Sequence, residues 1–140
     1  MFGYAGRVLH VDLTSGKTHT EPLNEEYAKK YIGGIGLGMR LWLDNSKPKI
    51  DPFDPENPLV VATGPISGTM WPTGGNGHAF VSKSPQTFGI GEAKAHGTFG
   101  TELKRAGYDA VVFKGKAEKP VYVWIDDDSV QLLDASGLMG

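Results

Sequence analysis

The chain contains no cysteine, no marked excess of charge of either sign and no long apolar run. Without cysteine it can form no disulfide and can offer no thiolate to an iron–sulfur cluster or a zinc ion. Its 14 basic and 16 acidic residues are scattered along 140 positions, which argues against a nucleic-acid-binding stripe and a polybasic membrane patch. No stretch approaches the ~20 apolar residues that cross a bilayer, and the first residues lack a signal-peptide pattern. We therefore expect a cytoplasmic protein that binds neither nucleic acid nor a membrane.

Glycine and proline, by contrast, are abundant, with 20 glycines and nine prolines. Both residues separate short β-rich segments, as turn formers do. Leu9, Val11 and Leu13 alternate with other residues, which predicts a half-buried strand, and a turn over residues 14–17 makes it part of an opening hairpin. The length fits one domain over residues 1–140, rich in strands and with helix as the minor element.

The remaining elements are predicted from caps, breakers and apolar runs. Asn24 is a helix cap, followed by Glu25 and Glu26 at the positive end of the helix dipole, and Gly33-Gly34 is expected to end this helix. The prolines between residues 48 and 58 exclude a helix there. The other expected elements are a helix over residues 37–43, a strand over 59–63, a helix over 98–106 stopped by Gly107, a strand over 110–113, and a hairpin of residues 121–125 and 130–133 across an acidic turn.

The segment from residue 64 to residue 100 is poor in large apolar side chains and dense in glycine, serine and threonine. Such a main chain is typically exposed or pressed against a ligand. Consecutive N–H groups in turns can bind anions, and glycine lets the backbone approach a planar, phosphorylated molecule without a Cβ in the way. We expect residues 64–100 to form an exposed cofactor-facing surface, with binding carried by the main chain.

Several familiar catalytic and nucleotide motifs do not match this sequence. The glycines of residues 33–38 lack the spacing of a dinucleotide fingerprint and follow a predicted helix rather than a strand. Residues 64–69 lack the lysine of a phosphate-binding P-loop. The four histidines do not have the spacing of a zinc-binding helix, and no nucleophile is paired with a base. No side chain is therefore assigned a catalytic role.

The three tryptophans differ in their surroundings. Trp42 and Trp124 lie in apolar periodic segments, which predicts core positions for both. Trp71 lies in the glycine-rich stretch, where a cofactor cavity and an interface explain it equally well.

Four linked motifs stand along the chain: GPISGT at residues 64–69, PTGG at 72–75, SKSP at 82–85 and FGTELKRAGYDA at 99–110. In sequence, order and spacing they resemble the successive signatures of the aldehyde:ferredoxin oxidoreductase family. The resemblance implies an α+β, β-rich and internally duplicated amino-terminal domain, whole or truncated. In that family the sheets of this domain form a base under a tungsten ion held by two pyranopterins. Molybdenum uses the same ligands, so the choice between the two metals stays open.

The resemblance also implies an activity and its partners. Family members oxidise aldehydes to carboxylic acids and pass electrons through a four-iron four-sulfur cluster to ferredoxin. Their cluster cysteines and acid–base groups lie in downstream helical domains, which agrees with the absence of cysteine in this chain. The expected partners are therefore the rest of the enzyme, in the same or a separate chain, and ferredoxin. A homo-oligomer stays open.

The resemblance assigns cofactor-binding residues position by position. Asn76 stands where well-known members have an arginine near the pterin phosphate and the cluster, so a charge is missing here. Lys94 stands where a backbone carbonyl helps to hold the magnesium ion that bridges the two pterin phosphates, and one hypothesis is that its amine replaces the missing charge. His96 stands where a glycine main chain approaches the pterin. The residues expected to bind the cofactor are Gly74, Gly75, Asn76, Lys94, His96 and Gly97.

Three functions remain open at this level. The first is a fragment or split subunit of a tungsten-pterin oxidoreductase. The second is a stand-alone module that carries or inserts the pterin cofactor. The third is a non-catalytic structural subunit that kept the fold and lost the site, for which Asn76 is the main indication.

Overall fold

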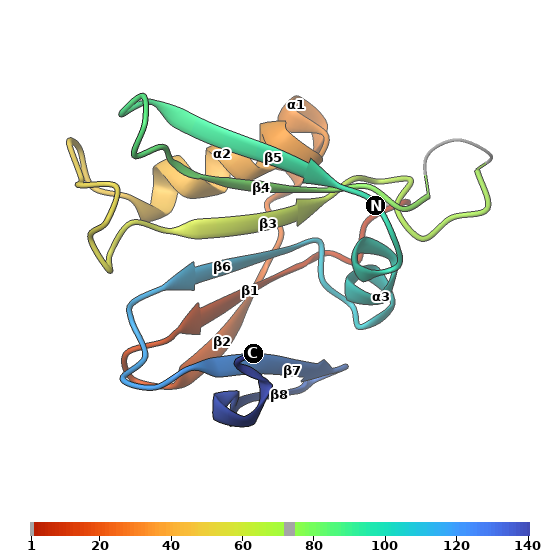
Figure 1. The fold of residues 1–140 in the computed structure, drawn as a ribbon. Helices are drawn as coiled ribbons and strands as arrows, with labels where there is room; N and C mark the ends of the chain where they lie inside the picture. Colours follow the sequence, from red (N-terminus) through yellow and green to blue (C-terminus); the bar gives the residue numbers. More distant parts are fainter. Residues whose placement is uncertain (1, 72–74) are drawn as a thin grey trace.

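The computed structural model describes residues 2–71 and 75–140, and over these residues it contains a six-stranded sheet, a two-stranded sheet and three α-helices (Figure 1). The strands of the large sheet lie in the order β2-β1-β6-β3-β4-β5. β1 and β6 pair in parallel, and the other neighbours pair antiparallel. The expected α+β, strand-rich class is confirmed. The six strands are β1 (Arg7–Asp12), β2 (Lys17–Pro22), β3 (Leu59–Thr63), β4 (His78–Lys83), β5 (Ile90–Ala95) and β6 (Ala110–Lys114).

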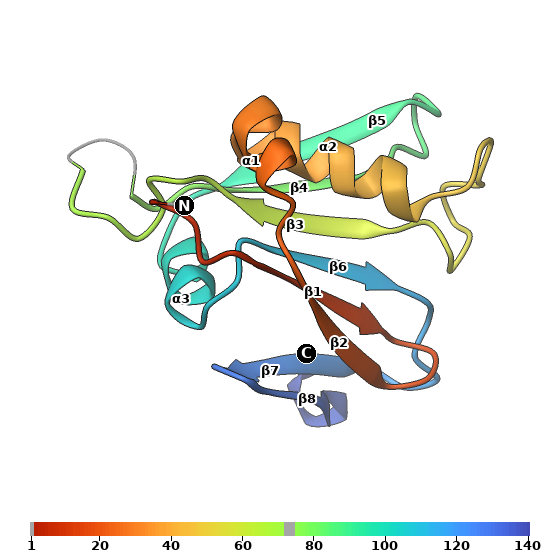
Figure 2. The same ribbon diagram turned by 180° about the vertical axis from the view of Figure 1, so that it is seen from behind.

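Two helices, α1 (Glu25–Tyr31) and α2 (Gly34–Asn45), cover one face of the sheet, as Figure 2 shows from behind. Asn24 caps α1 as predicted, because its Oδ1 accepts a hydrogen bond from the N–H of Glu26 at 2.8 Å. The second helix is longer at both ends than the predicted 37–43. It can pack closely on the sheet because Gly38 has no side chain: a Cβ there would lie 2.8 Å from Cγ2 of Val81.

The opposite face carries a separate hairpin of β7 (Val121–Asp126) and β8 (Ser129–Asp134), together with α3 (Phe99–Arg105) and a short 3-10 turn (Ser136–Leu138). The hairpin lies below β1 and β6 in Figure 1. Its inner residues alternate with outer ones, as the sequence predicted. The hairpin tip is tied to the sheet because Tyr108 Oη donates a hydrogen bond to the carbonyl of Asp127 at 3.0 Å.

Trp42 is buried in the helix-side core, as expected, but the core position predicted for Trp124 is wrong. Trp124 is 54% exposed because it points to the outer face of β7. Alternation along a strand predicts that one of its two faces is buried. Both faces of β7 carry apolar side chains, so the sequence does not indicate which face is buried.

The glycine-rich middle of the chain is less exposed than the sequence suggested. β4 lies between β3 and β5, and Ala79 and Val81 on it are almost fully buried. The prediction of an exposed surface over all of residues 64–100 is therefore wrong for β4. The burial of Val81 reflects the close approach of α2 at Gly38. The edge strand β5 is largely exposed, as expected.

The internal duplication implied by the family resemblance stays a prediction, since the two sheets described here differ in size and topology. Over the part of the chain that the structure describes, no helix combines the length and apolar character that a membrane span requires.

Candidate functional site

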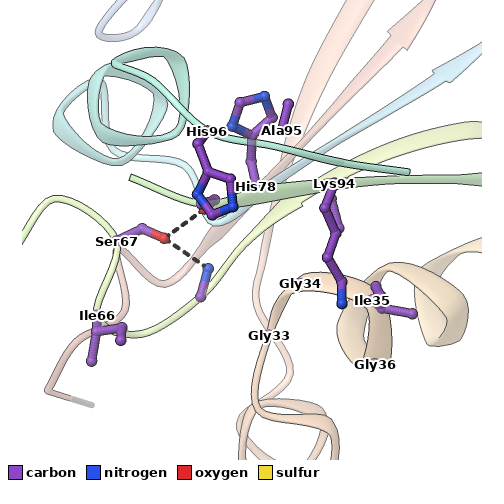
Figure 3. Close-up of a pocket in the computed structure, with 13 residues that line it drawn as sticks. Gly33, Gly34, Ile35, Gly36, Ile66, Ser67, His78, Lys94, Ala95 and His96 are labelled. Atoms are coloured by element: carbon purple, nitrogen blue, oxygen red, sulfur yellow. Dashed lines mark hydrogen bonds between the residues drawn. The ribbon is translucent and has the colours of Figure 1, made fainter. Parts of the chain in front are cut away.

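A pocket of about 370 Å³ opens at the end of the sheet where α2 begins (Figure 3). Four segments that lie far apart in the sequence meet around it: the start of α2, the loop after β3, the start of β4 and the end of β5. We call it the Lys94 pocket. Its lining residues are Gly33, Gly34, Ile35, Gly36, Gly64, Ile66, Ser67, Gly77, His78, Ala79, Lys94, Ala95 and His96.

The wall of the Lys94 pocket consists largely of main chain. Gly33 holds the start of α2 against the loop after β3, because a Cβ on it would lie 2.7 Å from Cα of Gly64. A Cβ on Gly64 would meet only Ser67 Oγ at 3.9 Å, so this part of the backbone faces open space. The buried Ser67 hydroxyl fixes the loop: it accepts from the N–H of Gly64 at 3.1 Å and donates to the carbonyl of Gly77 at 3.0 Å (Figure 3). A ligand here would contact a rigid, glycine-lined backbone.

The electrostatic environment of the pocket is positive. Lys94 extends from β5 toward the first turn of α2 (Figure 3), and it forms no ion pair with any described residue. The N-cap residue of this helix, Gly33, provides no side-chain cap for the free N–H groups of the first turn. Helix N-termini carry partial positive charge, so a cation beside one is unfavourable unless an anion lies between them. None of the lining residues is acidic, and the pocket therefore favours an anionic ligand.

Two histidines lie at the upper edge of the pocket in Figure 3. The His96 ring points into the pocket and packs over Gly77, whose added Cβ would lie 3.7 Å from the ring. The His78 ring is buried between Phe80 and Phe99, at centroid distances of 5.3 and 5.0 Å. Burial lowers the pKa of His78 below its ordinary value, and the neighbouring main chain of Asn76 opposes this lowering only in part. The pKa is lowered further by the charge of His96, so His78 is neutral at pH 7.

Of the predicted cofactor-binding residues that the structure describes, Lys94 and His96 line the pocket wall. Gly97 follows directly, with a φ of +119° and no protein atom within 4 Å of an added Cβ. Gly75 and Asn76 do not line the pocket and are hydrogen-bonded to α3. The carbonyl of Gly75 and Oδ1 of Asn76 accept from Thr101 Oγ1 at 3.1 and 3.3 Å.

The two sides of the predicted site therefore differ in their contacts. The 75–76 turn is tied to the body of the protein, because the carbonyl of Gly75 also accepts from the N–H of Gly68 at 2.7 Å. Gly74 lies outside the described residues. Trp71, for which a cavity and an interface were equally good explanations, is 65% exposed and does not line the Lys94 pocket.

Residues 33–36 were not predicted to contribute to the site, and Ser67 was predicted only as part of the surface of residues 64–100. The glycines at 33–36 were tested only against a dinucleotide fingerprint, which they do not match. The sequence did contain a signal: the N-cap position of this helix is Gly33, where Ser, Thr, Asp or Asn is more usual. A helix start without a capping side chain leaves N–H groups free to bind a ligand. Among the described residues, no group of three or more His, Asp or Glu side chains is arranged to hold a metal ion. A cation in this region would need carbonyl oxygens or the oxygens of a ligand.

Comparison with known proteins agrees with the motifs. Residues 8–140 match the family described as aldehyde ferredoxin oxidoreductase, N-terminal domain. The chain belongs to this family. Over all 140 residues it is 49% identical to the tungsten-containing aldehyde ferredoxin oxidoreductase of Pyrococcus horikoshii. It is 41% identical over 143 aligned positions to the aliphatic sulfonate oxidoreductase, WOR-like subunit, of Pyrococcus furiosus.

The fold is also shared with a solved structure, the active-site complex BamBC of benzoyl coenzyme A reductase in complex with 1,5-dienoyl-CoA. The TM-score is 0.93 at 37% sequence identity, and the match covers 99% of this chain and 21% of that one. The chain spans about 23% of the length of the tungsten-containing family members that it matches. It therefore corresponds to the amino-terminal domain of much larger enzymes.

Proposed function

We propose that this chain is the amino-terminal, cofactor-binding part of a tungsten-pterin oxidoreductase that oxidises aldehydes to carboxylic acids with ferredoxin as the electron acceptor. The observation that carries the proposal is the Lys94 pocket, a positive and glycine-lined cavity in a member of the aldehyde ferredoxin oxidoreductase family. The tungsten-containing relatives are named aldehyde ferredoxin oxidoreductases.

The residues of the pocket fit a bis-pyranopterin cofactor. A pterin is planar, and the open space above the main chain at Gly34 and Gly64 would accept such a surface without a Cβ in the way. Pterin phosphates are anionic, and the amine of Lys94 together with the free N–H groups of the α2 start would pair with them. When bound, the metal supplies the two-electron oxidation chemistry. The chain itself binds and orients the cofactor.

Other residues receive supporting roles under this proposal. The carbonyl of Lys94 would help to hold a magnesium ion between the phosphates, since magnesium prefers oxygen ligands. The turn of Gly74, Gly75 and Asn76, with Gly97 on the other side, would enclose the cofactor, and the His96 ring would lie against it. The iron–sulfur cluster needs cysteine thiolates, which this chain lacks, so the remainder of the enzyme would supply them.

The proposal is tested in the complete enzyme by replacing the pocket cation. A charged hydrogen bond to phosphate contributes about 1.5–3 kcal/mol, so Lys94→Ala should lower cofactor retention by about 10–150-fold. Pterin and tungsten would be quantified in purified protein after dialysis. Lys119→Ala is the matched control, because Lys119 is also exposed and does not line the pocket.

A second substitution tests whether Lys94 replaces the family arginine. Asn76→Arg in the Lys94→Ala background should restore retention if both positions serve one phosphate cluster, whereas independent positions would give additive effects. Equal pterin and tungsten content in Lys94→Ala, Lys119→Ala and the unmodified enzyme would contradict a cofactor-binding role for the pocket.

A further inference from the structure

Residues 3–6, which we call the 3–6 segment, precede β1 and contact both walls of the Lys94 pocket. The first contact is with the loop after β3, beside which the start of the chain lies in Figure 2. A Cβ on Gly3 would be 2.8 Å from the carbonyl oxygen of Pro65. Pro65 stands between two lining residues, Gly64 and Ile66. The backbone of Gly3 has a φ of +83°, so both its conformation and its close approach to the pocket loop favour glycine.

The second contact is with the connection between α1 and α2. The hydroxyl of Tyr4 donates a hydrogen bond to the carbonyl of Ile32 at 2.7 Å, and the carbonyl of Ala28 lies 3.1 Å from it. Ile32 has a φ of +64° and directly precedes Gly33, the N-cap of α2. A β-branched residue is strained at positive φ and stays there because its surroundings hold it. Burial and the negative charge of Asp109 raise the pKa of Tyr4 above its ordinary value, so the hydroxyl keeps the proton that it donates.

A buried ion pair attaches the 3–6 segment to the body of the protein. Asp109 is almost fully buried, and its carboxylate accepts hydrogen bonds from the N–H of Ala5 at 3.1 Å and the N–H of Gly6 at 2.6 Å. Lys104 forms an ion pair with the same carboxylate, and its amine donates to the carbonyl of Gly3 at 2.8 Å. Because breaking a buried ion pair is costly, these contacts hold the 3–6 segment firmly in one position.

The main chain of Asp109 also fixes the start of the pocket loop. Its carbonyl accepts hydrogen bonds from the N–H and from Oγ1 of Thr63, each at 2.9 Å. Thr63 ends β3 and is followed by Gly64, the first lining residue of the loop. The loop is therefore held at its start by Asp109 and at Pro65 by the 3–6 segment. Since Lys104 neutralises the carboxylate of Asp109, this support acts through position rather than through charge.

We propose that the 3–6 segment sets the separation between the two walls of the Lys94 pocket, and that Tyr4 and Asp109 are positioning residues for the ligand that binds between these walls. Neither residue lines the pocket, so each acts through the main chain of the walls. Hydrogen bonds weaken steeply when donor and acceptor move apart or out of line, so a ligand that contacts both walls needs a fixed separation. This inference rests on the proposed function, which identifies the ligand as the pterin cofactor.

Two glycine substitutions test the contact with the pocket loop in the complete enzyme. Gly3→Ala and Gly6→Ala each add one methyl group at nearly the same φ, +83° and +85°, and therefore carry a similar backbone cost. The new Cβ collides with Pro65 at Gly3, whereas at Gly6 it meets no described atom within 4 Å. Gly3→Ala should lower the retention of pterin and tungsten at least about fivefold relative to Gly6→Ala. Equal retention in the two variants would overturn the proposal.

Two tyrosine substitutions test the contact with the start of α2, also in the complete enzyme. Tyr4→Phe removes the hydroxyl that bonds to Ile32 and should lower the retention of pterin and tungsten by about 2–10-fold, the effect of one hydrogen bond. Amide hydrogen exchange, measured by mass spectrometry, should become faster by a similar factor over residues 32–40. Tyr108→Phe is the matched control. It removes one hydrogen bond, from Tyr108 to the carbonyl of Asp127 at 3.0 Å on the hairpin side, and should leave both measurements unchanged.

The two measurements separate this proposal from the proposed function. Hydrogen exchange does not depend on which ligand the pocket binds, so equal exchange over residues 32–40 in Tyr4→Phe and Tyr108→Phe would overturn the role of the 3–6 segment. If Lys94→Ala lowers cofactor retention and Tyr4→Phe does not, the proposed function stands and the positioning role is wrong. If neither variant lowers retention, the proposed function itself is wrong.

Discussion

Two lysines on neighbouring elements meet opposite electrostatic surroundings. Lys104 is nearly buried and is paired with Asp109, and its amine also donates to the carbonyl of Gly3 at 2.8 Å. Lys94 is exposed in its pocket and has no carboxylate partner among the described residues. In the first region the protein neutralises its own charge. In the second it leaves a charge beside a positive helix end, and no carboxylate among the described residues balances that charge.

The Asp109 cluster, formed by Asp109, Lys104 and residues 3–6, shows what a satisfied charge does for the fold. Asp109 is 1% exposed and accepts hydrogen bonds from the N–H groups of Ala5 at 3.1 Å and Gly6 at 2.6 Å. These bonds attach the amino-terminal segment to the α3–β6 connection. No comparable set of hydrogen bonds from the described residues surrounds Lys94, so removing each charge should have different consequences.

The largest expected effect follows from breaking the Asp109 cluster. Asp109→Asn leaves Lys104 buried without its counter-charge and should lower the free energy of unfolding by about 3–5 kcal/mol. Lys94→Ala is the control and should change it by less than about 0.5 kcal/mol. Urea denaturation followed by circular dichroism measures both. Comparable losses in the two variants would show that the two regions do not differ as described.

A smaller effect separates the structural glycines of the pocket from those that face open space. Gly33→Ala forces a Cβ to within 2.7 Å of Gly64 Cα and of the Thr63 carbonyl, and should cost about 1–3 kcal/mol of unfolding free energy. Gly64→Ala meets only Ser67 Oγ at 3.9 Å and should remain within about 0.5 kcal/mol of the unmodified chain. Thermal and urea unfolding of the pair check this; equal stability of the two variants would remove the distinction.

The smallest effect concerns pH. Since burial lowers the pKa of His78 in the folded chain, the unfolded chain takes up the proton first as pH falls below about 6.5. The contribution of His78 to stability is therefore complete above that pH and is lost as pH falls toward the lowered pKa of the folded state. His78→Phe should flatten the dependence of unfolding free energy on pH between about 7 and 5. An unchanged slope in this variant would show that His78 is not held neutral by burial.

Features set by local sequence were predictable. The Asn24 cap, the β1–β2 hairpin and the β7–β8 hairpin depend on neighbours a few residues away, and all three are present. β4 was missed because its burial comes from β3, β5 and α2, which no local pattern reveals. Trp124 was assigned to the core because both faces of its strand carry apolar residues.

The candidate site divides in the same way. Lys94 and His96 were identified through the family resemblance, and the structure places both in one pocket. Residues 33–36 lie about 60 positions earlier in the chain, roughly 200 Å if it were extended, so the packing of α2 on β3 and β4 is what brings them to Lys94. Every residue except proline has the same main-chain N–H group, so a site built from these groups is hard to recognise in a sequence.

The position of β6 in the sheet has a consequence for how the chain acquires its structure. β6 is inserted between β1 and β3, and among the described strands it is the one that joins the β1–β2 pair to the β3–β4–β5 group. Both of these groups can form from nearby residues soon after they leave the ribosome. The two groups can join into one sheet only after residues 110–114 are available. The sheet is therefore completed late, through contacts of high sequence separation, which are slow to form. Until that moment the segments that line the Lys94 pocket are held by the β3–β4–β5 group and α2. The edge of β3 that β6 will later occupy is exposed to the solvent.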